Sequence, residues 1–178
     1  MEVEKLKSLV LGTAAALSVA SMAIADRGSD GHVNIIYWQA PSILNPYLSG
    51  GTKDVESSSM IIDPLARYTQ DGELTPWLVT EIPTVANGGV SADLMSITWN
   101  ITPGIKWSDG SAFTAHDVVF SGEYCMDPDG GCAQSNKLAD VSNIEALDDL
   151  TVKVSFSVAK PFPYGPFVGA EQPIIQKA

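Results

Sequence analysis

The chain contains 178 residues, of which 10 are basic and 21 are acidic, so its formal net charge is −11 at pH 7. This charge argues against nucleic-acid binding and against docking on anionic lipid, because both depend on clustered Lys and Arg. With 45% hydrophobic and only 17% charged residues, the chain lacks the composition of an intrinsically disordered protein. About 150 residues suffice for one hydrophobic core, so the composition fits one soluble acidic domain or part of a larger one.

The first 25 residues have the pattern of a secretory signal peptide. Two lysines precede an uncharged apolar stretch at residues 9–20, and Ala23 and Ala25 then form an A-x-A cleavage site. The stretch is shorter than the about 20 apolar residues that cross a bilayer, and an amphipathic or buried helix is the alternative interpretation. We therefore expect cleavage before Asp26 and secretion to a bacterial periplasm.

Four elements are predicted between residues 33 and 74. The β-branched and aromatic residues of V-N-I-I-Y-W indicate a strand at residues 33–38, and residues 39–52, rich in Pro, Ser, Asn and Gly, form a loop. Apolar residues at helical spacing predict a helix at residues 55–68, which Pro64 is able to break. The Asp-Gly pair within residues 69–74 predicts a hairpin turn.

The clearest periodic pattern lies at residues 96–101. Polar and apolar residues alternate there, which predicts a strand with Ile97, Trp99 and Ile101 on one face. After a Pro-Gly turn, residues 105–107 are expected to form a second short strand.

Further elements follow toward the C-terminus. Thr114 and Asp117 have the spacing of a capping box, so a helix is expected at residues 115–124. Alternation predicts a strand at residues 150–158, and three prolines make residues 161–166 an extended crossing. These short strands and helices indicate an α/β or α+β fold.

Cys125 and Cys132 enclose a short Pro- and Gly-containing loop. In an oxidising periplasm such a pair is expected to form a disulfide. A metal or redox pair is the alternative, but the spacing is not C-x-x-C. Asp127 and Asp129 suggest a calcium loop, although the residues that follow break the motif and favour a solvated turn.

Other chemistry is sparse. His32 and His116 lack His, Cys or Glu partners at metal-ligand spacing, and the sequence contains no nucleophile elbow, P-loop or dinucleotide fingerprint. We therefore predict no metal and no cofactor. Four tryptophans are interpreted as core residues, with stacking on a sugar or peptide as the alternative: Trp38, Trp77, Trp99 and Trp107.

Several ordered motifs resemble those of family 5 extracellular solute-binding proteins, the peptide, oligosaccharide and nickel receptors of ABC importers. The most specific is W-N-I-T-P-G-I-K-W-S-D-G-S-A-F-T-A-H-D-V-V-F-S at residues 99–121. Further matches are L-N-P at 44–46, D-P-L-A-R-Y at 63–68, D-G-E-L-T-P-W-L-V-T at 71–80, and V-x-x-I-E-A-L-D-D-L-T-V-K-V at 141–154. Thr102–Pro103 and His116 depart from the family pattern, both at scaffold positions.

The resemblance implies an α/β fold: the N-terminal part of a two-lobed periplasmic-binding-protein fold (type II, cluster C-like) with a mixed, β-rich subdomain. Residues 26–178 would be the N-terminal portion of the solute-binding domain. Within it, residues 26–44 and 161–178 would belong to lobe one and residues 45–160 to an inserted subdomain. Family members are about three times as long, so the second lobe, which closes over the ligand, is expected to be missing.

The resemblance also implies a function. The protein would be the substrate-binding component of an ABC importer, a monomer and not an enzyme, that captures an oligopeptide or similar solute in the periplasm. It would deliver this solute to permease subunits in the inner membrane. The alternative is a secreted glycan or peptide hydrolase with an acidic cleft.

Ligand contacts in such a receptor come from loops at strand ends, where ordinary surface turns are the competing interpretation. The candidates are Gln39, Ala40, Pro41, Ser42, Gly50, Gly51, Thr52, Gln172 and Pro173.

Overall fold

The computed structural model describes residues 31, 32 and 34–177, so the predicted signal peptide lies outside the described residues. The chain divides into two units, Met1–Tyr37 and Trp38–Ala178, and each is considered by itself. The predicted strand at residues 33–38 is wrong, because residues 34–38 form no strand and Ile36 is 99% exposed. β-branched residues favour extended backbone, but a strand also requires a neighbour that pairs with its N–H and C=O groups.

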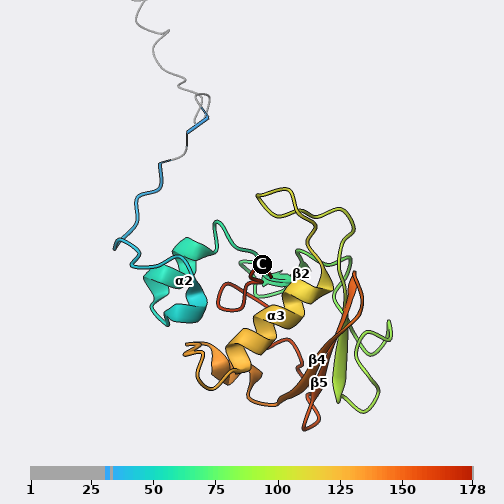
Figure 1. Ribbon diagram of the computed structural model, residues 1–178. Helices are drawn as coiled ribbons and strands as arrows, with labels where there is room; N and C mark the ends of the chain where they lie inside the picture. The colour runs from blue at the N-terminus through green and yellow to red at the C-terminus, as the bar shows by residue number, and fades with distance from the viewer. Residues whose placement is uncertain (1–30, 33, 178) are drawn as a thin grey trace, which may run out of the picture. The chain divides into compact units, whose positions relative to one another are not determined.

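The second unit contains short helices and two antiparallel sheets (Figure 1). β1 and β2 form a two-stranded sheet, and the other three strands form a sheet with the order β3-β5-β4. None of the helices in the described residues is long and apolar enough to cross a membrane. The elements in chain order are η1 (Pro46–Leu48), α2 (Thr52–Ser58), β1 (Ala66–Tyr68), β2 (Leu74–Pro76), β3 (Ser96–Asn100), α3 (Ala115–Met126), η2 (Ser135–Leu138), β4 (Val141–Asp148) and β5 (Thr151–Phe156).

The helix predicted at residues 55–68 is wrong in its extent. α2 begins at Thr52 and ends at Ser58, and the last three residues of the predicted helix form β1 instead. Pro64 lies between the two elements and disfavours helical backbone in the residue before it. The N–H of Leu65 donates to Phe167 O at 2.9 Å, so a partner distant in sequence takes the place of the intrahelical one.

The predicted hairpin turn is confirmed. β1 pairs with β2, the N–H of Thr69 donates to Glu73 O at 2.8 Å, and Gly72 has a φ of 81°. Glycine adopts this left-handed conformation without the steric cost of a Cβ, which explains the Asp-Gly pair.

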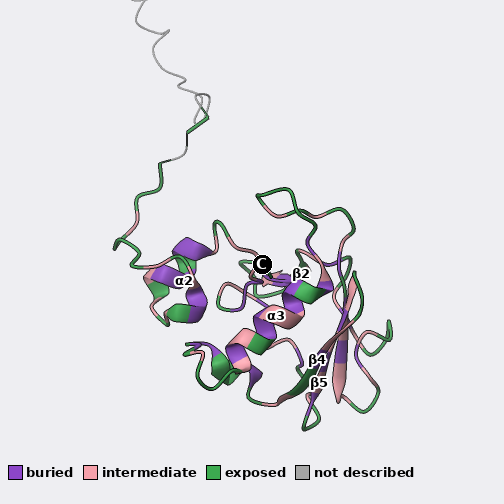
Figure 2. Cartoon of the chain, in the orientation of Figure 1, coloured by how far each residue is buried: buried purple, intermediate pink, exposed green. Residues whose placement is uncertain are grey.

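The alternating strand is also confirmed: β3 covers Ser96–Asn100, one residue fewer than predicted, and its inward-facing residues belong to the core. Ile97, Trp99 and Ile101 are at most 2% exposed, and β5 presents a second row of buried residues beside them. α3 packs against the β4–β5 side of this sheet, with buried residues on its inner face (Figures 1 and 2). The sequence patterns do not predict β4, whose burial does not alternate along the strand.

Two predicted strands are longer than the observed pairing. Residues 105–107 form only an isolated bridge between Lys106 and Ala112, so the second short strand is wrong. β5 covers Thr151–Phe156 rather than residues 150–158, because its pairing with β3 ends at Ser155 and its pairing with β4 ends at Phe156. Strand length is thus limited by the partner strand and not by the alternation itself.

The capping box is confirmed, since Thr114 and Asp117 exchange hydrogen bonds at the start of α3. One carboxylate oxygen of Asp117 accepts from the N–H of Thr114 at 2.8 Å and from Trp107 Nε1 at 3.3 Å. The other accepts from the N–H of Lys177 at 2.8 Å. Asp117 therefore joins the helix start, the preceding turn and the C-terminal segment.

The predicted disulfide is confirmed, and it joins Cys125 in the last turn of α3 to Cys132. The proline-containing residues 161–166 form no helix, as expected. Tyr164 anchors this crossing by donating its hydroxyl to Pro83 O at 2.6 Å.

Candidate functional site

The structure places the candidate ligand residues in two different environments. Residues 39–42, Gly50 and Thr52 are exposed, and Gly51 is half-buried. Gln172 and Pro173 are instead buried, with Gln172 at 0% exposure. The residues of the first group all lie within residues 39–52, which we name the candidate ligand loop. This loop ends at Thr52, the first residue of α2.

Asp54, in the first turn of α2, holds this loop together. Its side chain is buried, although Asp is seldom found inside proteins without partners. One carboxylate oxygen accepts from the N–H of Ser42 at 2.6 Å and from the N–H of Ile43 at 3.3 Å. The other accepts from Ser49 Oγ at 2.7 Å, and Ser49 Oγ in turn accepts from the N–H of Gly51 at 3.1 Å. Both ends of the loop therefore meet at one carboxylate.

Lys53 supplies the opposite charge. Its Nζ lies 2.8 Å from the Asp54 carboxylate and also donates to Ser42 Oγ. The hydrogen bond from Lys53 holds the pKa of Asp54 well below its usual range, and those from Ser49 and Ser42 add to the effect. We name these residues the Asp54 cluster: Ser42, Ser49, Gly51, Lys53 and Asp54. It orders the loop, and its own charges are already paired.

A pH titration tests this arrangement. Because the folded-state pKa of Asp54 lies below the unfolded value of about 3.9, ionised Asp54 stabilises the fold above that value, and this stabilisation is lost as the pH falls through the folded pKa. We expect the amide NMR signals of Ser42 and Ile43 to stay unchanged through about pH 4, where exposed carboxylates titrate, and to shift only in stronger acid.

The Asp54→Asn variant is the control, since its amide signals should show no such low-pH shift. A midpoint near the ordinary Asp value in the native protein would contradict the arrangement.

Gln172 and Pro173 support the loop from the interior. Tyr47, in η1, donates its hydroxyl to Pro173 O at 2.5 Å, and Gln172 Nε2 donates to Gln134 O at 3.4 Å. Gln172 Oε1 is buried without a hydrogen-bond partner among the described residues. Direct contact of these two residues with a ligand stays a prediction, and their burial indicates a supporting position.

Sequence reasoning missed Lys53, Asp54 and Tyr47. An acidic residue three positions after Gly51 is a helix-start signal, and it could have moved the predicted start of α2 to Thr52. No sequence pattern, however, indicates that this carboxylate is buried or that Tyr47 reaches Pro173, 126 residues away.

The core interpretation of the tryptophans is confirmed for two of the four. Trp99 is fully buried, and Trp107 packs against the core. Trp38 and Trp77 are 67% and 50% exposed, so the interpretation is wrong for them. The guanidinium of Arg67 lies 4.3 Å from the centre of the Trp77 ring, which gives this exposed ring a cationic partner.

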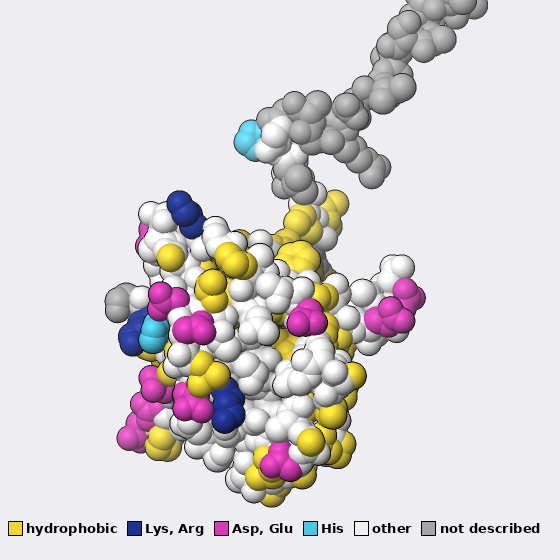
Figure 3. Space-filling view, turned by 90° about the vertical axis from the view of Figure 1, so that its right-hand side faces the viewer, with side chains coloured by type: hydrophobic (Ala, Val, Ile, Leu, Met, Phe, Trp, Pro, Cys, Tyr) yellow, Lys and Arg dark blue, Asp and Glu magenta, His cyan; other side chains and the backbone are white. Residues whose placement is uncertain are grey.

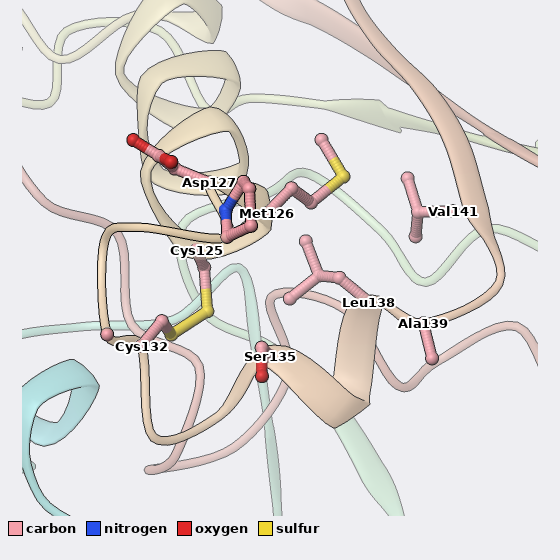
Figure 4. A pocket seen from close by; sticks show the side chains of 10 residues that line it. Cys125, Met126, Asp127, Cys132, Ser135, Leu138, Ala139 and Val141 are labelled. Atoms are coloured by element: carbon pink, nitrogen blue, oxygen red, sulfur yellow. A yellow bond between two sulfur atoms is a disulfide. The ribbon is translucent and has the colours of Figure 1, made fainter.

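A cavity of about 410 Å³ lies beside the disulfide, at the end of α3 (Figure 4). Met126, Leu138 and Val141 supply apolar side chains to its wall, whereas the carboxylate of Asp127 points away from them. Ser135 adds a hydroxyl to the wall, and Asp127 is the only charged residue among those that line the cavity.

On the face shown in Figure 3, most acidic side chains lie at the left with Lys, Arg and His side chains among them, so they do not form a purely acidic patch. Among residues 31, 32 and 34–177, no three His, Cys, Asp or Glu side chains are grouped to hold a metal ion. His116 lies 3.7 Å from Asp149 on the surface, a position that suits an ion pair when the imidazole is protonated.

Comparison with known protein families identifies the family of this chain. Residues 73–177, more than half of the chain, match the family described as bacterial extracellular solute-binding proteins, family 5 Middle. The chain belongs to this family. This match includes β2 to β5 and the buried segment with Gln172 and Pro173, but it begins after the Asp54 cluster.

Individual family 5 proteins agree with this assignment. The glutathione-binding protein GsiB of Pectobacterium atrosepticum is 34% identical over 79 residues, which cover 44% of this chain and 15% of that protein. The oligopeptide-binding protein OppA of Bacillus subtilis is 28% identical over 120 residues, which cover 64% and 20%. The chain therefore spans no more than a fifth of the length of these two relatives.

A solved structure supports the fold. OppA of Haemophilus influenzae, crystallised with the peptide RPPGFSPFR, has a TM-score of 0.69 and 21% identity over 77% of this chain and 29% of that one. The predicted fold class is confirmed as the N-terminal part of a type II periplasmic-binding-protein fold, with mixed helices and sheets.

Proposed function

We propose that this protein is the substrate-binding component of an ABC importer, which captures an oligopeptide or similar solute in the periplasm and delivers it to the permease. The observation that carries the proposal is the family 5 match over residues 73–177. The names of the two relatives above refer to binding of glutathione and oligopeptides. Both names describe binding proteins rather than enzymes, which favours this function over hydrolysis.

The arrangement of the candidate ligand loop suits such a role. Receptors of this kind bind by closure of two lobes around the solute, which requires ordered loops and no reactive group. The Asp54 cluster supplies an ordered loop whose residues 39–42 remain exposed. In this proposal residues 26–44 and 161–178 belong to lobe one, and residues 45–160 form the inserted subdomain.

Ligand-dependent stabilisation of the full-length gene product tests the function. A solute that binds only the folded protein raises its free energy of unfolding by about 2.7 kcal/mol when the free concentration is 100 times Kd. We expect thermal unfolding in a panel of peptides and oligosaccharides to show such a shift for at least one peptide class.

Two serine variants make the test specific to the loop. Ser42→Ala removes the hydroxyl that accepts from Lys53 and should weaken binding by about tenfold. Ser142→Ala changes an exposed serine on β4 and should leave the affinity unchanged. A panel without any stabilising solute, or turnover of a glycan or peptide that one carboxylate substitution abolishes, would overturn the proposal.

A further inference from the structure

The Cys125–Cys132 disulfide lies next to two residues that contact Tyr47. Tyr124 precedes Cys125 on α3, and its ring centre is 6.0 Å from that of Tyr47. Ala133 follows Cys132, and its N–H donates to the Tyr47 carbonyl oxygen at 2.8 Å. The disulfide keeps the two cysteine Cα atoms 5.0 Å apart, so it also limits how far these two neighbours can separate.

Tyr47 has little freedom of its own. It is 0% exposed, its N–H donates to the Asn45 side chain at 3.0 Å, and its hydroxyl donates to Pro173 O. Burial raises the pKa of Tyr47 well above its ordinary value, so the hydroxyl stays a neutral donor. Tyr124 and Ala133 therefore both contact η1 at its central residue, Tyr47.

η1 leads directly into the Asp54 cluster. Ser49 caps the C-terminal end of η1, and its hydroxyl donates to Asp54. Gln134, in the segment that follows Cys132, donates its Nε2 to Ser49 O at 3.5 Å. A continuous series of contacts therefore runs from the disulfide through Tyr47 and Ser49 to the carboxylate that binds the Ser42 N–H.

We propose that the Cys125–Cys132 disulfide positions the candidate ligand loop through Tyr47. Without the covalent bond, the seven-residue separation between the cysteines gives the segment before Ala133 the conformational freedom that the closed ring removes. The contacts of Tyr47 with Tyr124 and Ala133 are then no longer held in place. The Asp54 cluster loses the support that it receives from η1. The role in ligand binding rests on the proposed function, whereas the ordering of the loop does not.

Hydrogen exchange in the full-length protein tests the proposal. In the Cys125→Ser/Cys132→Ser variant, we expect the amides of Ser42 and Ile43 to exchange about tenfold faster than in the native protein. This acceleration should exceed that of the β5 amides. Val152→Ala is the matched control, because it weakens the buried face of β5 and leaves every contact in the series intact. In that control the loop amides should not accelerate more than those of the sheet.

A second variant acts at the other end of the series. Tyr47→Leu with the disulfide intact should accelerate the same two amides, and removing the disulfide as well should add little, because the pair acts as one unit. If the cysteine variant fails to fold, Tyr47→Leu alone still tests the proposal, because unchanged exchange of the loop amides in it would rule out a role of Tyr47. Unchanged Ser42 and Ile43 exchange in Tyr47→Leu, or fully additive effects of the two changes, would overturn the proposal.

The exchange measurement needs no ligand, so the two proposals fail separately. A loosened loop in a protein that binds no solute of the panel would retain the positioning role and overturn the receptor function. Native loop exchange and native affinity in the cysteine variant would retain the receptor function and overturn the positioning role.

Discussion

Replacing Trp99 by Ala is expected to lower the free energy of unfolding by about 3–5 kcal/mol. Trp99 is fully buried in β3, and its ring meets the ring of Tyr164 edge-on with centres 6.3 Å apart. Truncation would leave a cavity on the buried face of β3 and remove this contact with the Pro-rich crossing. Urea unfolding followed by tryptophan fluorescence and circular dichroism measures the loss.

Two further tryptophan variants test whether the loss comes from the burial of Trp99. Trp99→Phe keeps an aromatic ring and removes a buried indole N–H that has no acceptor among the described residues. We therefore expect the free energy of unfolding to fall by only about 1–2 kcal/mol. Trp77→Ala removes a half-exposed ring and its contact with Arg67, so we expect the free energy of unfolding to fall by about 1 kcal/mol. Equal losses for Trp77→Ala and Trp99→Ala would contradict the assignment of Trp99 to the core.

Asp117→Ala is the second substitution with a large expected effect, at about 2–4 kcal/mol of unfolding free energy. The change leaves the N–H groups of Thr114 and Lys177 and the indole N–H of Trp107 without their common acceptor. Because Asp117 is buried, water cannot fully replace the carboxylate.

Glu123→Ala is the matched control for Asp117, since it removes an exposed carboxylate from the same helix. Its effect should stay within about 0.5 kcal/mol. Urea unfolding of both variants measures these free energies. A loss for Asp117→Ala as small as that of the control would show that α3 does not depend on its capping box.

Family membership and fold class were both accessible from the sequence, because the motif at residues 99–121 combines several local signals in a fixed order. The capping box at Thr114 and Asp117 and the turn at Gly72 each depend on residues within a few positions of one another. Such signals act before any tertiary contact forms, so they could be interpreted without a structure.

The candidate site was only partly accessible. The sequence predicts residues 39–42 and 50–52 as loop residues, and in the structure Ser42 binds Asp54 directly whereas Gly51 reaches it through Ser49. The sequence does not point to Asp54 itself, because an acidic residue in the first turn of a helix is usually a solvated one. Its burial depends on Ser42, 12 positions earlier, and on how η1 packs.

The sequence by itself determined the family, the turns, the start of α3, the alternating strand β3 and the pairing of Cys125 with Cys132. Only the tertiary structure decided that residues 34–38 form no strand, that α2 ends at Ser58 and that Gln172 lies inside. The reason is physical: turns and caps are made by neighbouring residues, whereas strand pairing and burial require partners that lie far away along the chain.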